Sequence, residues 1–141
     1  MMVASIVFAS IEVGQFLPDL VLPPISRTTL ALYAGASGDH NPNHIDIDAA
    51  RAAGMDDVFA HGMLPMAFLG RLLTGWAPQR QIQHFEARFV SITHVGDCIT
   101  CRGEVVQKIE DHEGKRLVLT LYARDQQGDI KLTGSATMVF D

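Results

Sequence analysis

The sequence predicts a single α+β domain in which an antiparallel sheet wraps around one central buried helix. Residues 62–76 are apolar in nearly every direction and carry one charge, Arg71, which is typical of a buried helix. Short extended pieces precede this segment, and four strand-like runs follow it. A sheet curled around the helix satisfies that order of elements. At 141 residues the chain can bury a core as one domain, residues 1–141.

The chain begins with extended backbone and a first helix. Residues 10–25 read as extended and end in two prolines. Ser26 then stands where an N-cap is needed, so we predict a helix over residues 27–36. Three residues about one turn apart would form its buried stripe: Leu30, Tyr33 and Ala34.

Two further helices are predicted downstream. Asp46 or Asp48 can cap a short helix over residues 49–53. The central helix then runs over residues 62–76. Pro65 fits in its first turn, because the N–H that proline lacks has no intrahelical acceptor there.

The last part of the chain predicts an antiparallel meander. The four strand-like runs are residues 83–93, 97–109, 115–125 and 130–140. Glycine-containing turn signals separate them: Val95-Gly96-Asp97, His112-Glu113-Gly114 and Gln127-Gly128-Asp129.

The segment from Tyr33 to His44 holds two side chains suited to proton transfer, Asp39 and His44. Pro42 lacks an N–H and disfavours a helical conformation of Asn41, so the pair must lie on an irregular loop. Loops of this kind often carry catalytic groups. On spacing alone, a polar turn with an Asx cap explains the same residues.

The complete segment favours the catalytic loop over the polar turn. Tyr33-Ala-Gly-Ala-Ser-Gly-Asp-His-Asn-Pro-Asn-His44 and the later block Ala60-His-Gly-Met-Leu64 closely resemble the signature of the MaoC-like, R-specific enoyl-thioester hydratases. The resemblance covers nearly the whole chain in order and separation. It is nearest to the small dehydratase subunits of mycolic-acid-type elongation and to short R-hydratases. Asn43 differs, because the family has an apolar residue there, and this bears on the shape of the acyl pocket.

The resemblance implies the hotdog fold, a dimer of like chains and a reversible hydration of enoyl thioesters on CoA or acyl carrier protein. Asp39 and His44 would act on one water, and syn addition would give the R-3-hydroxyacyl product. The free N–H of Gly62, at the positive end of the central helix, would hold the thioester oxygen. No metal or organic cofactor is implied. Sequence does not decide whether Asp39 or His44 is the base, nor the acyl chain length.

Five further residues are candidates for contact with the substrate. Tyr33 is expected to pack under the loop, and Asn41 to brace it through backbone hydrogen bonds. His61 would be the neighbour of the N-cap of the central helix. Met55 and Met63 belong with the core and could line an acyl tunnel. The remaining histidines, His84, His94 and His112, read as surface or strand-edge residues.

Other classes of function are disfavoured. The net charge is −5, with no basic run, which argues against a nucleic-acid partner. Residues 1–9 are apolar but short and lack basic residues, so they make a poor signal peptide, and no run is long enough to span a membrane. A cytoplasmic enzyme is expected.

Metal and redox sites are also disfavoured. His40 and His44 have helical metal-ligand spacing, but Pro42 prevents the helix. Cys98 and Cys101 fall in a strand-like run, about 10 Å apart, and read as two independent thiols.

Two alternative functions stay open. A hotdog thioesterase would place an acidic residue on or beside the central helix, and this helix carries none. A partner subunit of a heterodimeric dehydratase, with or without its own activity, is the other alternative.

Overall fold

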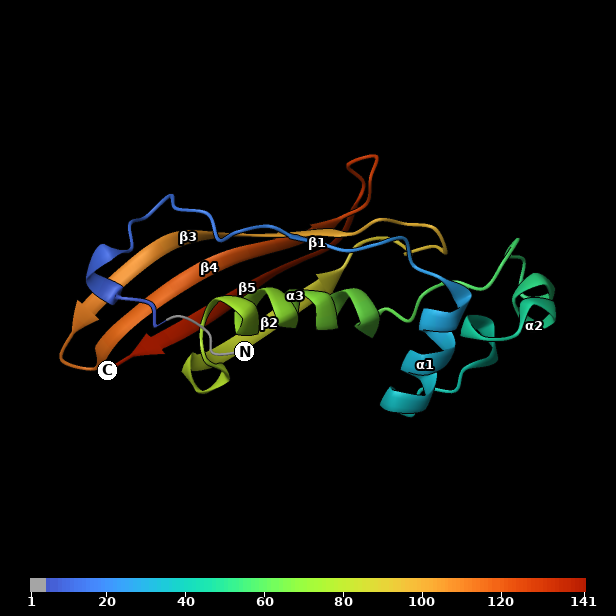
Figure 1. Cartoon of the computed structure of the whole chain (residues 1–141), viewed down its shortest axis with the longest axis horizontal. Coiled ribbons are helices and arrows are strands. Elements are labelled where there is room, and N and C mark those ends of the chain that lie inside the picture. Colours follow the sequence, from blue (N-terminus) through green and yellow to red (C-terminus); the bar gives the residue numbers. More distant parts are fainter. Residues whose placement is uncertain (1–4) are drawn as a thin grey trace.

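The computed structural model describes residues 5–141, so the first four residues of the apolar N-terminal stretch lie outside the described residues. A five-stranded sheet curls around helix α3 (Met63–Trp76), as predicted (Figure 1). Neighbouring strands are antiparallel throughout. In spatial order the strands are β1 (Leu20–Val21), β3 (Thr100–Asp111), β4 (Gly114–Arg124), β5 (Ile130–Phe140) and β2 (Ile82–Phe89).

The helices that precede α3 begin at caps the sequence predicts. The Ser26 side chain accepts a hydrogen bond from the Thr29 N–H, and α1 spans Arg27–Ser37. Helix α2 spans Ile47–Ala52 and starts two residues earlier than predicted, because Asp46 is its cap and accepts the N–H groups of the following turn. Three short 3₁₀ turns complete the elements: η1 (Phe8–Ser10), η2 (Pro42–His44) and η3 (Gln79–Gln81).

The predicted pairing of the first long strand was wrong. Strand β2 does not form a hairpin with β3 but crosses to the far edge and pairs with β5. The turn at Gly96, which has φ of 91°, packs instead against the segment before α1, where the Gly96 N–H donates to the Ile25 carbonyl at 2.7 Å. The meander is therefore limited to β3, β4 and β5.

The predicted bounds of two strands were also wrong. Strand β2 ends at Phe89 rather than at residue 93, because the N–H groups of Val90 and Ser91 both donate to the Lys131 carbonyl and leave the regular ladder. Strand β3 begins at Thr100, three residues later than predicted.

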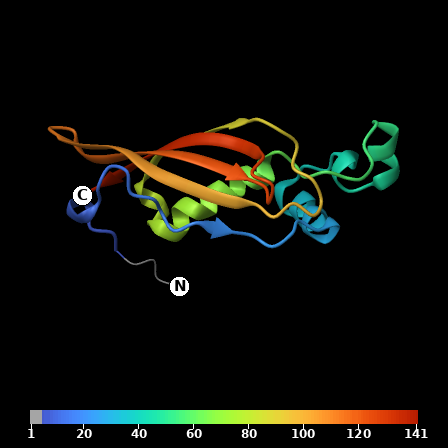
Figure 2. The same ribbon diagram turned by 90° about the horizontal axis from the view of Figure 1, so that it is seen from above.

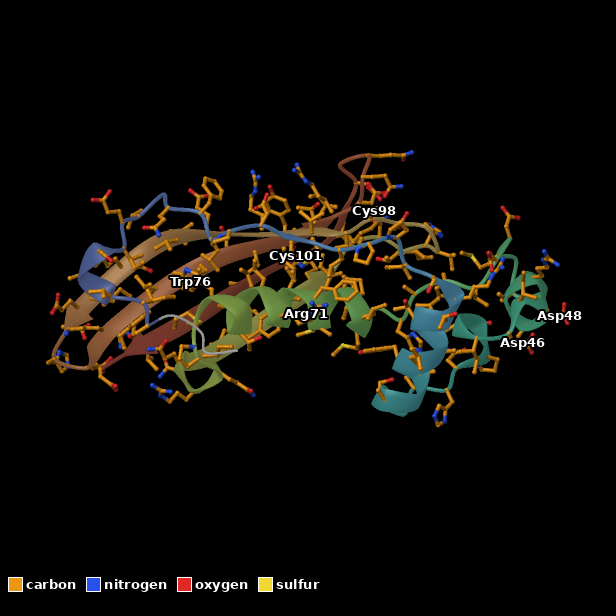
Figure 3. The ribbon with its side chains drawn as sticks, in the orientation of Figure 1. Asp46, Asp48, Arg71, Trp76, Cys98 and Cys101 are labelled. Atoms are coloured by element: carbon orange, nitrogen blue, oxygen red, sulfur yellow. The ribbon has the colours of Figure 1, made fainter. Side chains whose placement is uncertain are left out.

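Helix α3 is not buried on all sides, as its composition suggested. Its buried residues face the sheet: Leu64, Pro65, Phe68, Leu69, Leu72 and Leu73. Residues four apart on the other side form an exposed row: Met63, Ala67, Arg71 and Gly75. Figure 2 shows α3 beneath the concave face of the sheet, and Figure 3 labels Arg71 on this helix. A helix that is apolar all round but exposed along one row points to a further surface that covers it.

The two cysteines are free thiols, as predicted. Cys98 precedes β3, and Cys101 lies within it (Figure 3). Burial raises the pKa of the Cys101 thiol to about 12, so it stays protonated and packs as a small apolar side chain. Within residues 5–141, no helix is both long and apolar enough to cross a bilayer.

Helices α1 and α2, with η2 between them, lie beyond one end of the sheet (Figures 1 and 2). We call residues 26–58 the overhang. The N-terminal end of α3 is directed toward it. Asp39 and His44 therefore come from the overhang, whereas Gly62 comes from the main body.

Candidate active site

The loop after α1 is held open by its own side chains. Gly38 ends the helix in the left-handed region, with φ of 77°. The Asp39 N–H then donates to the Ser37 hydroxyl at 3.1 Å. One carboxylate oxygen of Asp39 accepts the Asn41 N–H at 3.2 Å, and the Asn41 side chain accepts the Asn43 N–H at 3.1 Å. These bonds confirm the irregular loop and the bracing role predicted for Asn41.

His44 lies at the end of η2 with only 8% of its surface exposed. Its Nδ1 lies 2.7 Å from the Phe59 carbonyl oxygen. A carbonyl can only accept, so Nδ1 carries the hydrogen and donates. The lone pair of the neutral ring is therefore on Nε2, the nitrogen that can take a proton from water.

His61 is completely buried and lies against His44. The two ring centroids are 4.1 Å apart, and Tyr33 meets the His61 ring edge-on at 4.9 Å. Nε2 of His61 lies 3.1 Å from the Asp39 carbonyl oxygen. Burial lowers the pKa of His61, and the neighbouring His44 lowers it further, although the bond to Asp39 opposes this. His61 is the neighbour of the N-cap, as predicted, but sequence reasoning missed its contact with His44.

The side chains of Asp39, His44 and His61 converge. One carboxylate oxygen and one nitrogen from each ring lie within 4.8 Å of one another. A water that hydrogen-bonds at about 2.8 Å to each of two groups can bridge them at this separation. These side chains are also of the types that bind metal ions.

A cavity of about 360 Å³ opens beside His44 and Gly62. Its walls are apolar and come from Phe59, Ala60, Phe89, Val90, Ile92 and Leu132. Sequence reasoning missed these wall residues, because they come from three separate segments, residues 59–60, 89–92 and 132, with no distinguishing pattern. The cavity joins an apolar surface to one titratable ring, an arrangement suited to a ligand with a hydrophobic part and one reactive centre.

Gly62 is the N-cap of α3, with φ of −57°, and the Gly62 N–H has no acceptor among the described residues. It therefore offers a free donor at the positive end of a helix.

The other predicted contacts lie elsewhere. Tyr33 packs against His61, and its pKa is raised by burial and by the charge of Asp39. Met55 lines a separate cavity of about 220 Å³ beside α2. Met63 is 51% exposed, in the open row of α3. Contact of Met55 and Met63 with an acyl chain stays a prediction.

Lys131 is a buried cation behind the cavity wall. It is 3% exposed, and Nζ donates to the Ile92 carbonyl at 2.9 Å and to the Asp129 carboxylate at 2.8 Å. Two buried carboxylates, of Asp125 and Asp97, lie at 3.4 and 3.7 Å. Burial alone would lower the pKa of Lys131, but these three carboxylates raise it. The Lys131 ammonium group thus holds in place the segment after β2 that forms part of the cavity wall.

Lys131→Met should lower the free energy of unfolding by about 2 kcal/mol, because it leaves two buried carboxylates without their cation. This is below the usual cost of breaking a buried pair, since backbone N–H groups still bond Asp97 and Asp125. Because the folded pKa of Lys131 is raised, its contribution should be present at neutral pH and be lost as the pH rises through that value. Denaturant titration measures both effects.

The matched control is Lys115→Met, whose ammonium group contacts only the carbonyl of Asp141 in the part of the chain that the structure describes. If both lysine variants unfolded at the same denaturant concentration, the buried cluster would not contribute as described.

Comparisons with known proteins agree with this fold. The family model described as MaoC like domain matches residues 18–126. The chain is 29% identical over 136 residues to the (R)-specific enoyl-CoA hydratase of Rhodospirillum rubrum, covering 94% of this chain and 90% of that protein. It superposes on the unliganded R-hydratase PhaJ1 of Pseudomonas aeruginosa with a TM-score of 0.82 and 27% identity, over 94% of this chain and 83% of that one. For the ChsH1-ChsH2 complex of Mycobacterium tuberculosis the TM-score is 0.78, with 25% identity, over 92% and 98% of the two chains.

Proposed function

This chain belongs to the MaoC-like dehydratase family, has the hotdog fold and is a hydratase or dehydratase of this type, and we propose that it hydrates trans-2-enoyl thioesters reversibly to R-3-hydroxyacyl thioesters. The observation that carries this proposal is the position of His44: its side chain lies within reach of the Asp39 carboxylate, and it lines an apolar cavity together with Gly62, whose N–H is free. The substrate would be carried on CoA or acyl carrier protein.

The proposed reaction gives each of the three groups a task. A water held between Asp39 and His44 loses a proton to His44, and its oxygen, which keeps the other hydrogen, forms the new bond to Cβ of the enoyl group. The double bond's electrons move toward the thioester oxygen, where the Gly62 N–H stabilises the developing charge. The lone pair on Nε2 supports His44 as the group that takes the water proton, and the Asp39 carboxylate orients the water. The same proton then passes from His44 to Cα on the same face, so both side chains end in the state in which they began.

The test of this proposal is direct. Purified protein should consume crotonyl-CoA, followed as loss of the ultraviolet absorbance of the enoyl thioester, and chiral analysis should find the R product. We propose that no metal or organic cofactor takes part, so chelator should leave the rate unchanged. Absence of turnover with both CoA and acyl-carrier-protein substrates would contradict the function. A cytoplasmic location stays a prediction from the sequence.

A thioesterase is the weaker alternative. Such enzymes of this fold are expected to carry an acidic residue on or beside the central helix, and Met63–Trp76 contains neither Asp nor Glu. Release of free thiol from crotonyl-CoA, without hydration, would favour it.

We propose further that the chain works as a two-fold dimer or as a heterodimer with a similar chain. Strand β2 is an edge strand, and the exposed row of α3 runs beside it, where the Phe85 ring approaches Gly70. Pairing two such sheets edge to edge would cover both surfaces. The similarity to the ChsH1-ChsH2 complex is the observation that supports a heterodimer.

Light scattering at micromolar concentration should therefore give twice the 15.4 kDa of one chain. Ala67→Arg, in the exposed row of α3, should shift the protein toward the monomer by placing a charge in the interface. Thr120→Arg, on an exposed position of β4, is the control and should leave the dimer intact. An active, monodisperse monomer of the unmodified chain would contradict the proposal.

A further inference from the structure

His61 is the one buried titratable ring beside the candidate site to which the proposed chemistry gives no task. It touches every part of the site: its Nε2 contacts the Asp39 carbonyl, its face lies on His44, and it directly precedes Gly62. Its Nδ1 is buried and has no hydrogen-bond partner among the described residues. A buried acceptor without a partner destabilises the folded protein, so a histidine at this position needs a reason.

We propose that His61 is a positioning residue that stays neutral, with its hydrogen on Nε2, and holds Asp39 and His44 in register with Gly62. This role rests on the proposed hydration. In it, His61 acts through Asp39 and His44 and does not itself touch the reacting atoms.

The contacts of the ring determine its protonation state. A carbonyl oxygen 3.1 Å from Nε2 requires a donor there, so the lone pair is on Nδ1. A second hydrogen on Nδ1 would find no acceptor and would put a buried positive charge against His44. The titratable groups that face the ring are His44 from η2, Asp39 from the loop after α1 and Tyr33 from α1. Asp39 and its carbonyl favour a charged ring, but burial and His44 oppose it. The two stacked rings therefore have different tasks: His44 exchanges a proton with the water, whereas His61 stays neutral.

The combination of contacts explains why neither an amide nor a benzene ring is equivalent at this position. The flat face supports His44 from one side, and the edge donor holds the Asp39 backbone on another. Gln reaches a carbonyl with a similar donor but offers no ring. Phe offers the ring but no donor. The two variants therefore separate the two contacts.

The first experiment measures the protonation state of the His61 ring. Nitrogen chemical shifts of labelled histidine should show His61 with Nε2 protonated and Nδ1 unprotonated, unchanged as the pH falls through the range in which an ordinary imidazole becomes charged. This measurement does not depend on turnover, so it can succeed even if hydration of crotonyl-CoA fails. Protonation of His61 within that range, or a hydrogen on Nδ1, would overturn the proposal.

The second experiment uses the variants. His61→Phe should lower kcat roughly 100-fold with little change in KM. The Phe ring cannot donate to the Asp39 carbonyl, so the Asp39 backbone should move by up to about 1 Å. His61→Gln should recover at least about tenfold of that loss, by restoring the donor. The midpoint of the acid limb of the kcat profile should stay in place in His61→Gln, since a neutral group replaces a neutral ring. His84→Gln, at an exposed histidine of β2, is the control.

A merely structural role predicts a different result. Loss of kcat would then follow loss of melting temperature in both variants, and Gln would not rescue Phe. That result, or kcat within twofold of the unmodified protein in both variants, would overturn the positioning role.

Discussion

Asp39→Asn and His44→Ala should each lower kcat by roughly 10³-fold, with the melting temperature nearly unchanged. General acid and base groups contribute about 10²–10⁴-fold each, and here both act on one water. Asn at position 39 keeps an oxygen that can accept the Asn41 N–H, so the loop should stay folded. Ala at position 44 removes Nε2 and also the bond to the Phe59 carbonyl, so a small loss of stability is expected. Initial rates with crotonyl-CoA and thermal melts measure the two quantities.

The double variant should be little slower than either single one, because groups that act as a unit are not additive. His40→Ala, at the exposed neighbour of Asp39, is the matched control and should keep full activity. Either residue would be removed from the mechanism if its single variant kept more than about a tenth of the activity.

Gly62→Val should lower kcat/KM by roughly 10³-fold, the upper end for loss of one oxyanion donor. A side chain at this position is directed at the Phe89 ring, whose nearest carbons lie 3.4 Å from the place of a Cβ. That ring is part of the cavity wall, so a branched side chain would occupy the space where the thioester must approach the backbone. The buried side of α3 is not involved, and folding should be affected far less than turnover.

Gly62→Ala is the finer variant, because it keeps the N–H and adds one methyl group. The native φ of −57° suits alanine, so unfolding stability should hold. We expect kcat/KM to fall roughly 10²-fold if the carbonyl is displaced by about 1 Å. Equal losses of melting temperature and activity would instead make Gly62 a close-packing glycine, and the oxyanion donor would have to be another group.

Local signals in the sequence were sufficient for the helices and the loop. The caps at Ser26 and Asp46 and the proline at position 42 act within one turn of the chain, so the bounds follow from neighbouring residues. The strand-like runs and glycine turns that predict β4 and β5 likewise depend on neighbouring residues.

The pairing of β2 with β5 could not be predicted from neighbouring residues. It joins residues far apart in the sequence, and the Gly96 turn that suggests a hairpin docks on Ile25 instead. The stacking of His61 on His44 and the carboxylate cluster around Lys131 also join residues that are not neighbours in the sequence, so no local signal predicts them.

The position of the overhang gives the protein a route of inactivation without loss of its sheet. Asp39 and His44 contact the main body through two hydrogen bonds, one from His61 to Asp39 and one from His44 to Phe59, and through the stacking of His44 on His61. A local opening of residues 26–58 would break these contacts and separate Asp39 and His44 from Gly62, while β3, β4 and β5 stayed paired. Amide hydrogen exchange should therefore be faster in α1 and α2 than in the central strands, and denaturant should abolish turnover before it melts the sheet. For this molecule, the concentration of competent enzyme would be set by the opening equilibrium of the overhang rather than by global unfolding.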